Sequence, residues 1–279
     1  ILQGTILLSA DGGGGGGGGP AMFEAVQRMP WQDLQAEIVA WISAMKVAVG
    51  LLFPAEKRLC HYIFGDWSAG TALSCFVGIT KKAMLELLTF ADAVAITECS
   101  HEKLFKILDM YECLHPLIPA IGSLFGQQQE DGHSMRSVGT SGIYTEASET
   151  LGRLGNAARI TFSAFETMVL RHDDPSKMLI SDRGRLRLVE YVMNYLRFLS
   201  DFMNPMNQLL WERNDDQTGS VSSTSRASSG DQPGDDIGLG NQDFRPLSLS
   251  MLRLMEALEK KLDAKSKLYK DLGLSYLFL

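Results

Sequence analysis

The sequence predicts an all-α protein, built as an elongated rod of stacked antiparallel helical bundles. Apolar residues recur at intervals of three and four positions from Trp31 onward, which is the period of an amphipathic helix. No convincing strand-like alternation follows residue 20. Long helices joined by short turns are typical of side-by-side bundles. A compact globule fits the same pattern, but helix lengths near 40 Å, roughly 1.5 Å per residue, favour the rod.

Composition supports a large core and argues against a nucleic-acid partner. Of the 279 residues, 45% are hydrophobic, enough to build a core without disulfide or metal staples. The formal net charge is −7. A broad nucleic-acid footprint requires a basic face, so we expect no nucleic acid among the partners.

The N-terminal segment is dominated by eight consecutive glycines, Gly12–Gly19, followed by Pro20. The run formally contains a GxGxxG pattern, but a dinucleotide-binding loop needs its last glycine to open a helix. Eight glycines disfavour any helix start. We therefore expect residues 1–30 to be a flexible Gly-rich segment preceding a helical-bundle region over 31–279.

The first helical pattern begins at Trp31 and is followed by a second after Pro54, which breaks the helix or opens the next one. The first stripe comprises Leu34, Ile38, Trp41, Ile42 and Met45. The second helix carries Arg58, Leu59, Cys60, Ile63 and Phe64 and stops near Gly65 and Gly70.

Three further helices are predicted before a polar loop over 127–142. One runs from about 72 to 96, with Met84, Leu87, Leu88 and Ala91 on one face. The next has Ser100 as its expected N-cap and an apolar set of Leu104, Ile107, Leu108 and Tyr111. Pro116 opens or bends a short helix that ends at Gly126.

The clearest helix is predicted over 143–171, and it is followed by a turn over 172–181 that contains Pro175. Its stripe is Leu151, Leu154, Ala158, Phe162, Phe165 and Val169. Another long helix reaches about Glu212 with Leu186, Val189, Met193, Leu196 and Leu199 as its stripe. The last helix, from Ser248, has Met251, Met255, Leu258 and Leu262 inside, and an exposed Glu256–Lys260 pair.

A serine-rich, acidic stretch predicts a disordered loop over 214–244 that interrupts the helical region. Residues 215–243 contain no aromatic side chain and cannot bury enough apolar area to offset the ordering entropy. The segment includes Arg226-Ala-Ser228, a weak kinase-recognition pattern. An unmodified linker is the preferred interpretation.

Membrane-spanning and secretory signals are not expected. The longest apolar run, 39–53, is interrupted by Lys46 and does not reach 18 residues. The N-terminus lacks the basic start of a signal peptide, and no Asn-X-Ser/Thr site occurs. We expect a cytoplasmic protein.

No catalytic residue, cofactor site or metal site is predicted, so the chain is not expected to be an enzyme. The four cysteines (Cys60, Cys75, Cys99 and Cys113) are too far apart for a zinc site and are expected to be reduced thiols. The five histidines (His61, His101, His115, His133 and His172) have no partner at metal spacing. A Cys60–His61 pair is disfavoured because adjacent helical side chains diverge. The carboxylate pairs Asp173-Asp174 and Asp215-Asp216 are interpreted as solvated loop charge.

One basic cluster lies in the last helix. It comprises Lys260, Lys261, Lys265, Lys267 and Lys270, with Glu259, Asp263 and Asp271 interleaved. We interpret it as a solvated helix face, with a lipid or partner contact as the alternative.

Three stretches, in order, resemble plant Exo70 proteins. They are Phe53-Pro-Ala-Glu-Lys-Arg-Leu-Cys60, then Leu104-Phe-Lys-Ile-Leu-Asp-Met-Tyr-Glu112 with Leu117-Ile-Pro-Ala-Ile121, and finally 262–279 with its Lys-Ser-Lys-Leu-Tyr run. Val192-Met-Asn-Tyr-Leu196 also fits. The resemblance covers the chain from about Trp31 onward and places it in the middle of such a protein.

The resemblance implies a subunit of the exocyst, a non-enzymatic scaffold that tethers secretory vesicles to the plasma membrane in exocytosis. Expected partners are other exocyst subunits, with small GTPases, immune regulators and pathogen effectors as further candidates. The protein would be cytoplasmic and recruited peripherally to the plasma membrane or vesicles. The family binds phosphoinositide membranes near its C-terminus, a region this chain does not reach, so no lipid-binding residue is carried over. The alternative is a divergent helical recognition module that binds a short peptide or a pathogen effector in plant immunity.

Overall fold

The computed structural model describes residues 18–65, 69–97, 100–125, 141–171, 182–218 and 246–271, and every regular element in these ranges is a helix. The prediction of an all-α helical-bundle fold is confirmed. The chain divides into two compact units, residues 1–162 and 163–279, and the boundary falls within one long helix. The rod-like arrangement of the bundles stays a prediction.

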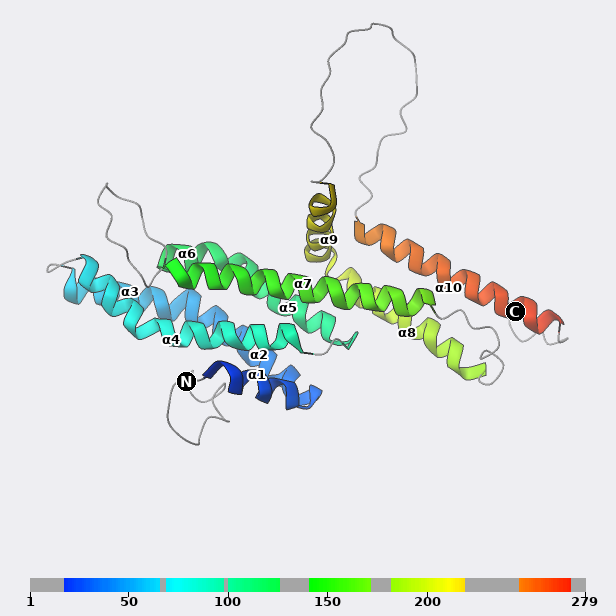
Figure 1. Cartoon of the computed structure of the whole chain (residues 1–279), viewed down its shortest axis with the longest axis horizontal. Helices are drawn as coiled ribbons and strands as arrows, with labels where there is room; N and C mark the ends of the chain where they lie inside the picture. The colour runs from blue at the N-terminus through cyan, green and yellow to red at the C-terminus, as the bar shows by residue number, and fades with distance from the viewer. Residues whose placement is uncertain are drawn as a thin grey trace, which may run out of the picture. The chain divides into compact units, whose positions relative to one another are not determined.

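The first unit contains the elements from α1 to most of α7 (Figure 1). They are α1 (Gly18–Arg28), α2 (Trp31–Val47), the π-helix η1 (Ala48–Leu52), α3 (Phe53–Phe64), α4 (Ala69–Ile96), α5 (Lys103–Leu114), the 3-10 helix η2 (His115–Leu117), α6 (Ile118–Phe125) and α7 (Ser141–Arg171). Helices α3 and α4 pack along each other, and α2 packs against α5.

Aromatic side chains from three helices build one end of this core. Phe125 of α6 lies 5.2 Å from Phe76 of α4 in a stacked arrangement and 5.9 Å from Phe53 of α3, edge to face. All three rings are buried. Ring pairs of this geometry contribute about 0.5–1.5 kcal/mol beyond the burial of their area. Pro54 lies in the first turn of α3, which is one of the two predicted possibilities; the other, a break, does not occur, because the helical run continues from Trp31 to Phe64.

Trp41 fixes the other end of the same core. Its ring is fully buried, and its indole Nε1 donates a hydrogen bond to the carbonyl of Leu87, at 2.7 Å. The bond satisfies the one polar atom of the ring and ties α2 to α4. The buried residues of α2 are Leu34, Ile38, Trp41 and Met45, so its predicted stripe is confirmed at these four positions.

Helix α1 corrects the prediction that residues 1–30 are flexible throughout. Residues 18–28 form a helix that packs on α4 and buries Val26. Glu24 and Arg28 form an exposed i,i+4 ion pair on its outer side. The apolar residues after the glycine run recur at helical spacing, and their packing outweighs the entropic cost of two glycines in the first turn. Residues 1–17 lie outside the described ranges.

The entry to α5 also differs from the prediction. The N-cap is Glu102, with no capping hydrogen bond from its side chain, and not Ser100. Ser100 contributes its backbone carbonyl, which accepts a hydrogen bond from the amide of Lys103. A turn before the helix takes the place of a side-chain cap.

The second unit contains the end of α7 and three further helices: α8 (Asp182–Ser200), α9 (Met203–Thr218) and α10 (Pro246–Asp271). The single helix predicted to reach Glu212 is wrong, because α8 ends at Ser200 and α9 begins at Met203. Pro205 explains the break, since its ring clashes with the carbonyl four residues earlier and it has no N–H to donate. Between the two helices, the amide of Asp201 donates a hydrogen bond to the carbonyl of Phe198, and the amide of Phe202 donates one to the carbonyl of Leu199.

The prediction of which residues of α8 and α10 face inward is partly wrong, because in each helix the residue before a predicted one is buried in its place. Met193, Met255 and Leu262 are exposed, whereas Val192 and Leu254 are buried. In α8 and α10 two apolar residues stand side by side, so the sequence allows two stripes, and packing selects one of them. In α7 the predicted stripe is buried from Leu154 to Val169.

Helices α9 and α10 are joined by a long-range cap. The side-chain Oδ1 of Asn207 accepts a hydrogen bond from the amide of Leu247, at 3.0 Å. Both residues are buried. The amide of Leu247 belongs to the first turn of α10, where helical amides have no partner within the helix.

Several predicted loops lie outside the described residues: most of 127–142, the turn over 172–181, and the stretch 219–245. Residues 214–218, which the prediction placed in the disordered loop, are the last turn of α9.

The continuous helical run Trp31–Phe64 meets the length and composition criteria of a membrane span, although Lys46 interrupts its apolar residues. Core helices of bundles meet the same criteria. Leu34, Ile38 and Trp41 are buried within the bundle, but only 33% of the most apolar window is buried. Part of this run therefore presents apolar side chains at the surface.

Candidate interaction surface

The described histidine, cysteine and carboxylate side chains offer no metal site. Among the described ranges, no group of three or more His, Cys, Asp or Glu side chains could hold a metal ion. His61 and His115 are exposed, and His101 is half-buried; His133 and His172 lie outside the described residues. Asp173-Asp174 also lies outside them, and Asp215-Asp216 belongs to the last turns of α9.

The thiols that the structure describes are unpaired and poorly placed for nucleophilic work. Cys60 and Cys113 are buried, and Cys75 is half-buried. Burial raises the pKa of the Cys60 thiol, and the neighbouring Cys75 and Glu56 raise it further. Burial likewise raises the pKa of Cys113. A raised pKa keeps the thiol protonated, so neither side chain is an activated nucleophile. Cys60 is buried while His61 is exposed, so the two point in different directions, as expected of helix neighbours.

A surface hollow with a defined lining lies between α3 and α4. We call it the α3–α4 groove; it has a volume of about 650 Å³ and is lined by Lys57, Arg58, His61, Tyr62, Ala72 and Leu73. These six lining residues include three groups that can carry positive charge and no carboxylate. In a chain of net charge −7, this is a local basic site beside an apolar wall.

Lys57 lines the groove, but its ammonium group is already hydrogen-bonded within the fold. Its ammonium donates hydrogen bonds to the carbonyls of Ser123 and Leu124, at 2.8 and 2.9 Å. These carbonyls belong to the last turn of α6, where the helix dipole favours a cation. Burial lowers the pKa of Lys57 from its usual value. The residue ties α3 to α6 and leaves Arg58 and His61 to face solvent.

Beside the groove, α3 and the end of η1 expose a row of apolar side chains, which we call the outer stripe: Leu52, Ala55, Leu59 and Tyr62. The exposed fraction is 37% for Leu52, 50% for Leu59 and 86% for Tyr62. Ala55 is exposed as well. Sequence reasoning placed Leu59 within a helix but did not identify this surface.

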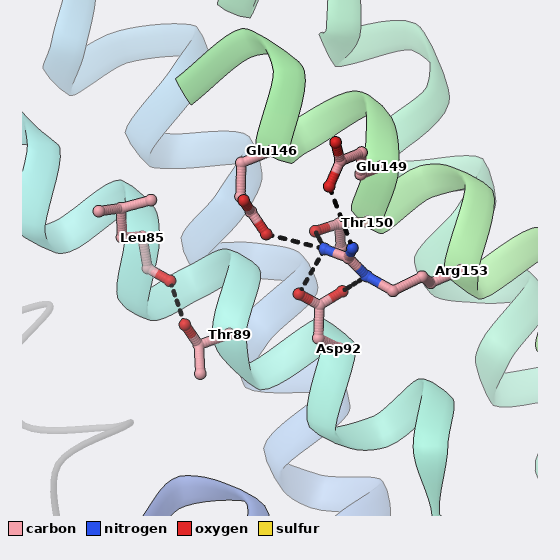
Figure 2. Close-up of polar contacts among 7 residues, drawn as sticks. All are labelled: Leu85, Thr89, Asp92, Glu146, Glu149, Thr150 and Arg153. Carbon is pink, nitrogen blue, oxygen red and sulfur yellow. Dashed lines mark hydrogen bonds and ion pairs between the residues drawn. The ribbon is translucent and has the colours of Figure 1, made fainter. Parts of the chain in front are cut away.

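A second polar cluster joins α4 to α7 (Figure 2). The guanidinium of Arg153 binds both carboxylate oxygens of Asp92, with Nε–Oδ1 at 2.7 Å and Nη2–Oδ2 at 2.8 Å. It also contacts Glu146 and Glu149, and it donates to the hydroxyl of Thr150 at 3.1 Å. The hydrogen bond to Asp92 is the largest cause of the raised pKa of Arg153. Arg153 is therefore surrounded by three carboxylates. The contact with Asp92 joins α7 to α4, and the contacts with Glu146 and Glu149 lie within α7. We call this cluster the clamp.

The predicted lysine cluster in α10 is partly engaged in the fold. Lys261 donates a hydrogen bond to the carbonyl of Val169, near the end of α7. Lys260 and Lys267 are exposed, as are the neighbouring acidic residues Glu259 and Asp263. The side chains of Lys265 and Lys270 lie outside the described residues. The described part of the cluster is a mixed-charge helix face, which matches the preferred interpretation.

The described residues therefore define a class of protein: an all-helical bundle whose distinctive features are surfaces between and along helices. Comparison with known families gives the same class. The family model for the C-terminal part of the Exo70 exocyst complex subunit matches residues 39–279. The chain belongs to the Exo70 family.

Individual relatives are plant proteins. The chain is 36% identical over 256 residues to exocyst complex component EXO70B1 of Arabidopsis thaliana, covering 92% of the chain and 35% of that protein. It is 34% identical to EXO70A1 of the same plant, covering 92% of the chain and 34% of the relative. For EXO70I of Medicago truncatula the identity is 27%, with 92% and 33% covered. The chain thus spans about a third of the length of the curated relatives it matches.

Proposed function

We propose that this chain is part of an exocyst component, and that it acts as a non-enzymatic helical scaffold in tethering secretory vesicles to the plasma membrane. The observation that carries the proposal is the family match over 39–279 together with relatives that are exocyst components. Burial favours the protonated thiol at Cys60 and Cys113, and no group of described His, Cys, Asp or Glu side chains could hold a metal ion; both observations support a role through surfaces.

The proposed partners follow from the same membership. Other exocyst subunits are the first candidates; small GTPases and immune regulators are further ones. The proposed location is the cytoplasm, with peripheral recruitment to vesicles or the plasma membrane. For phosphoinositide membranes the described part of the lysine cluster gives little support, because acidic residues are interleaved and Lys261 is engaged with α7.

Affinity purification of the tagged full chain from plant cells, followed by mass spectrometry, tests the proposal. We expect other exocyst subunits to be enriched over a tag-only control. A chain that is strongly helical by circular dichroism and enriches no exocyst subunit would contradict it. The folding check matters because an unfolded bait gives the same negative result.

A second candidate function, recognition of a short peptide or a pathogen effector, is favoured by one observation, the α3–α4 groove. Grooves between helices commonly receive a peptide segment. A peptide-library screen on the purified chain distinguishes the two functions, since a scaffold without peptide recognition returns no consensus sequence.

A further inference from the structure

A single heptad pattern runs through α2, η1 and α3, but only its first half is buried. Nine residues recur at alternating intervals of four and three: Leu34, Ile38, Trp41, Met45, Ala48, Leu52, Ala55, Leu59 and Tyr62. The first five are buried, and the last four are exposed and form the outer stripe. An unbroken α-helix would keep all nine on one side.

The π-helix η1 explains the change of face. It occupies Ala48–Leu52, at the point where burial of the heptad stops. A π-turn holds one extra residue and turns the following helix by roughly 100°, one residue's share of an α-helical turn. The buried positions accordingly move by one, to Val49, Phe53 and Cys60. The core of the first unit uses these residues, and the second half of the heptad pattern faces outward.

The outer stripe has the spacing that a helix–helix contact requires. In heptad terms, Leu52 and Leu59 occupy a positions, and Ala55 and Tyr62 occupy d positions. The row extends over residues 52–62, roughly 16 Å at 1.5 Å per residue. In the sequence it continues the heptad pattern whose first half is buried inside the bundle. A second helix is therefore the occupant that this surface fits best.

The charge beside the stripe indicates which helix would bind. Arg58 and His61 border it on the side of the groove, and neither forms an ion pair within the described part of the chain. Glu56 lies half-buried on the opposite side. A partner with acidic residues on the flank that faces Arg58 would gain a complementary contact.

We propose that the outer stripe and the α3–α4 groove together bind an amphipathic helix of another protein, with apolar residues at heptad spacing and an acidic flank. This goes beyond exocyst membership and can be tested on the purified chain alone. A membrane surface is less favoured, because Arg58 is a single permanently charged side chain among the described groove-lining residues that the fold leaves unengaged, and anionic lipid attracts larger clusters of basic residues.

The test uses two synthetic three-heptad peptides with leucine at every a and d position. One carries glutamate at its flanking positions and the other carries lysine, and the like charges keep each peptide from self-association. Fluorescence anisotropy of the labelled peptides measures binding to the full chain. We expect saturable binding of the glutamate peptide, roughly three- to tenfold tighter than that of the lysine peptide, because exposed ion pairs contribute only modestly to affinity.

Three variants test whether this surface carries the binding. Leu59→Ser/Tyr62→Ser removes two anchors, and we expect affinity for the glutamate peptide to fall by at least about thirtyfold. Both side chains are exposed, so the melting temperature should hold. Arg58→Glu should reduce or reverse the preference between the peptides. Ile160→Ser is the matched control, because this residue of α7 is 52% exposed but lies outside the stripe, and binding should be unchanged.

Four outcomes would overturn the proposal. They are no saturable binding of either peptide, equal binding of both, glutamate-peptide binding that survives Leu59→Ser/Tyr62→Ser, and loss of binding in Ile160→Ser. Two further results would replace it with a different occupant. Concentration-dependent dimerisation that Leu59→Ser/Tyr62→Ser abolishes would assign the stripe to a second copy of the chain. Sedimentation with phosphatidylserine vesicles that depends on the stripe, without peptide binding, would assign it to a membrane.

Discussion

Two polar contacts, one in each unit, join helices by different physical means. In the first unit, Arg153 of α7 binds Asp92 of α4 through two charged hydrogen bonds, with the Arg153 side chain 36% exposed. In the second, the neutral amide of Asn207 caps α10 from within a buried site. The difference teaches that a charged contact at the rim and a neutral one in the core should respond differently to salt. They also differ in which group loses its partner when one residue is substituted: a carboxylate in the first unit and a backbone amide in the second.

The largest effect is expected from Arg153→Met. It leaves Asp92, whose side chain is only 11% exposed, without its cation. Breaking a fully buried pair costs roughly 3–5 kcal/mol, and the partial exposure of Arg153 reduces this to about 2–3 kcal/mol. Urea unfolding followed by circular dichroism measures the loss.

Salt tests the mechanism of that loss. The difference between wild type and Arg153→Met should shrink in roughly 1 M NaCl, because salt screens a partly exposed pair. Arg28→Met, which removes an exposed i,i+4 pair, is the matched control and should change stability little. A loss no larger than that of the control would show that the clamp does not stabilise the fold.

Asn207→Ala should come next, at about 1–3 kcal/mol, because the buried amide of Leu247 loses its acceptor. Hydrogen exchange of the peptide that begins α10 should quicken, and salt should not alter the effect. Asn207→Asp should lose less than Asn207→Ala, because it keeps an acceptor at the N-terminus of α10 and removes the Nδ2 group, which has no hydrogen-bond partner.

Asn194→Ala, at an exposed position of α8, provides the control for the loss of an asparagine. If Asn207→Ala behaves like Asn194→Ala, the long-range cap does not hold α10. The contrast between the two units would then disappear.

A pH effect of about 1 kcal/mol is expected from Tyr195 near pH 11, since one pKa unit corresponds to about 1.4 kcal/mol. Its ring stacks on Phe165 at 3.8 Å, and burial raises the pKa of its phenol above the ordinary value of 10.0. Above that ordinary value the unfolded chain loses this proton while the folded chain keeps it, so the free energy of unfolding falls as pH rises. Tyr195→Phe should show a shallower fall between about pH 10 and 11. Identical pH dependence in both proteins would contradict the burial of an un-ionised phenol.

The smallest effect is expected at the rim of the clamp. Glu149→Gln removes a carboxylate whose side chain is 57% exposed and 3.3 Å from Arg153. We expect a change of about 0.5 kcal/mol or less in the free energy of unfolding, as for other exposed pairs. A loss as large as that of Arg153→Met would mean that the network acts as one unit and not chiefly through Asp92.

Much of the fold could be predicted because helical periodicity is local. The stripes of α2, α5 and α7 are largely buried, as the spacing of their apolar residues indicates. The break before α9 also has a local signal, Pro205, but the apolar stripe continues past it and favours a single helix. Where two apolar residues stand together, as at Leu254-Met255, the local pattern does not say which one packs inward.

The long-range polar contacts that join the helices could not be predicted in the same way. Asp92 and Arg153 are 61 positions apart, and Asn207 and Leu247 are 40 apart, so neither pair leaves a local pattern. The outer stripe did leave a signal, the unbroken heptad from Leu34 to Tyr62. The signal predicts one continuous buried face. Only the π-turn, which depends on packing against neighbouring helices, shows that its second half faces outward.

Direct binding of purified exocyst subunits to the immobilised full chain is the most direct test of action through helical surfaces. Helicity would be checked by circular dichroism in the same samples. We predict saturable binding of at least one subunit to the folded chain. A chain that is fully helical and binds none of them would contradict the proposed scaffold role.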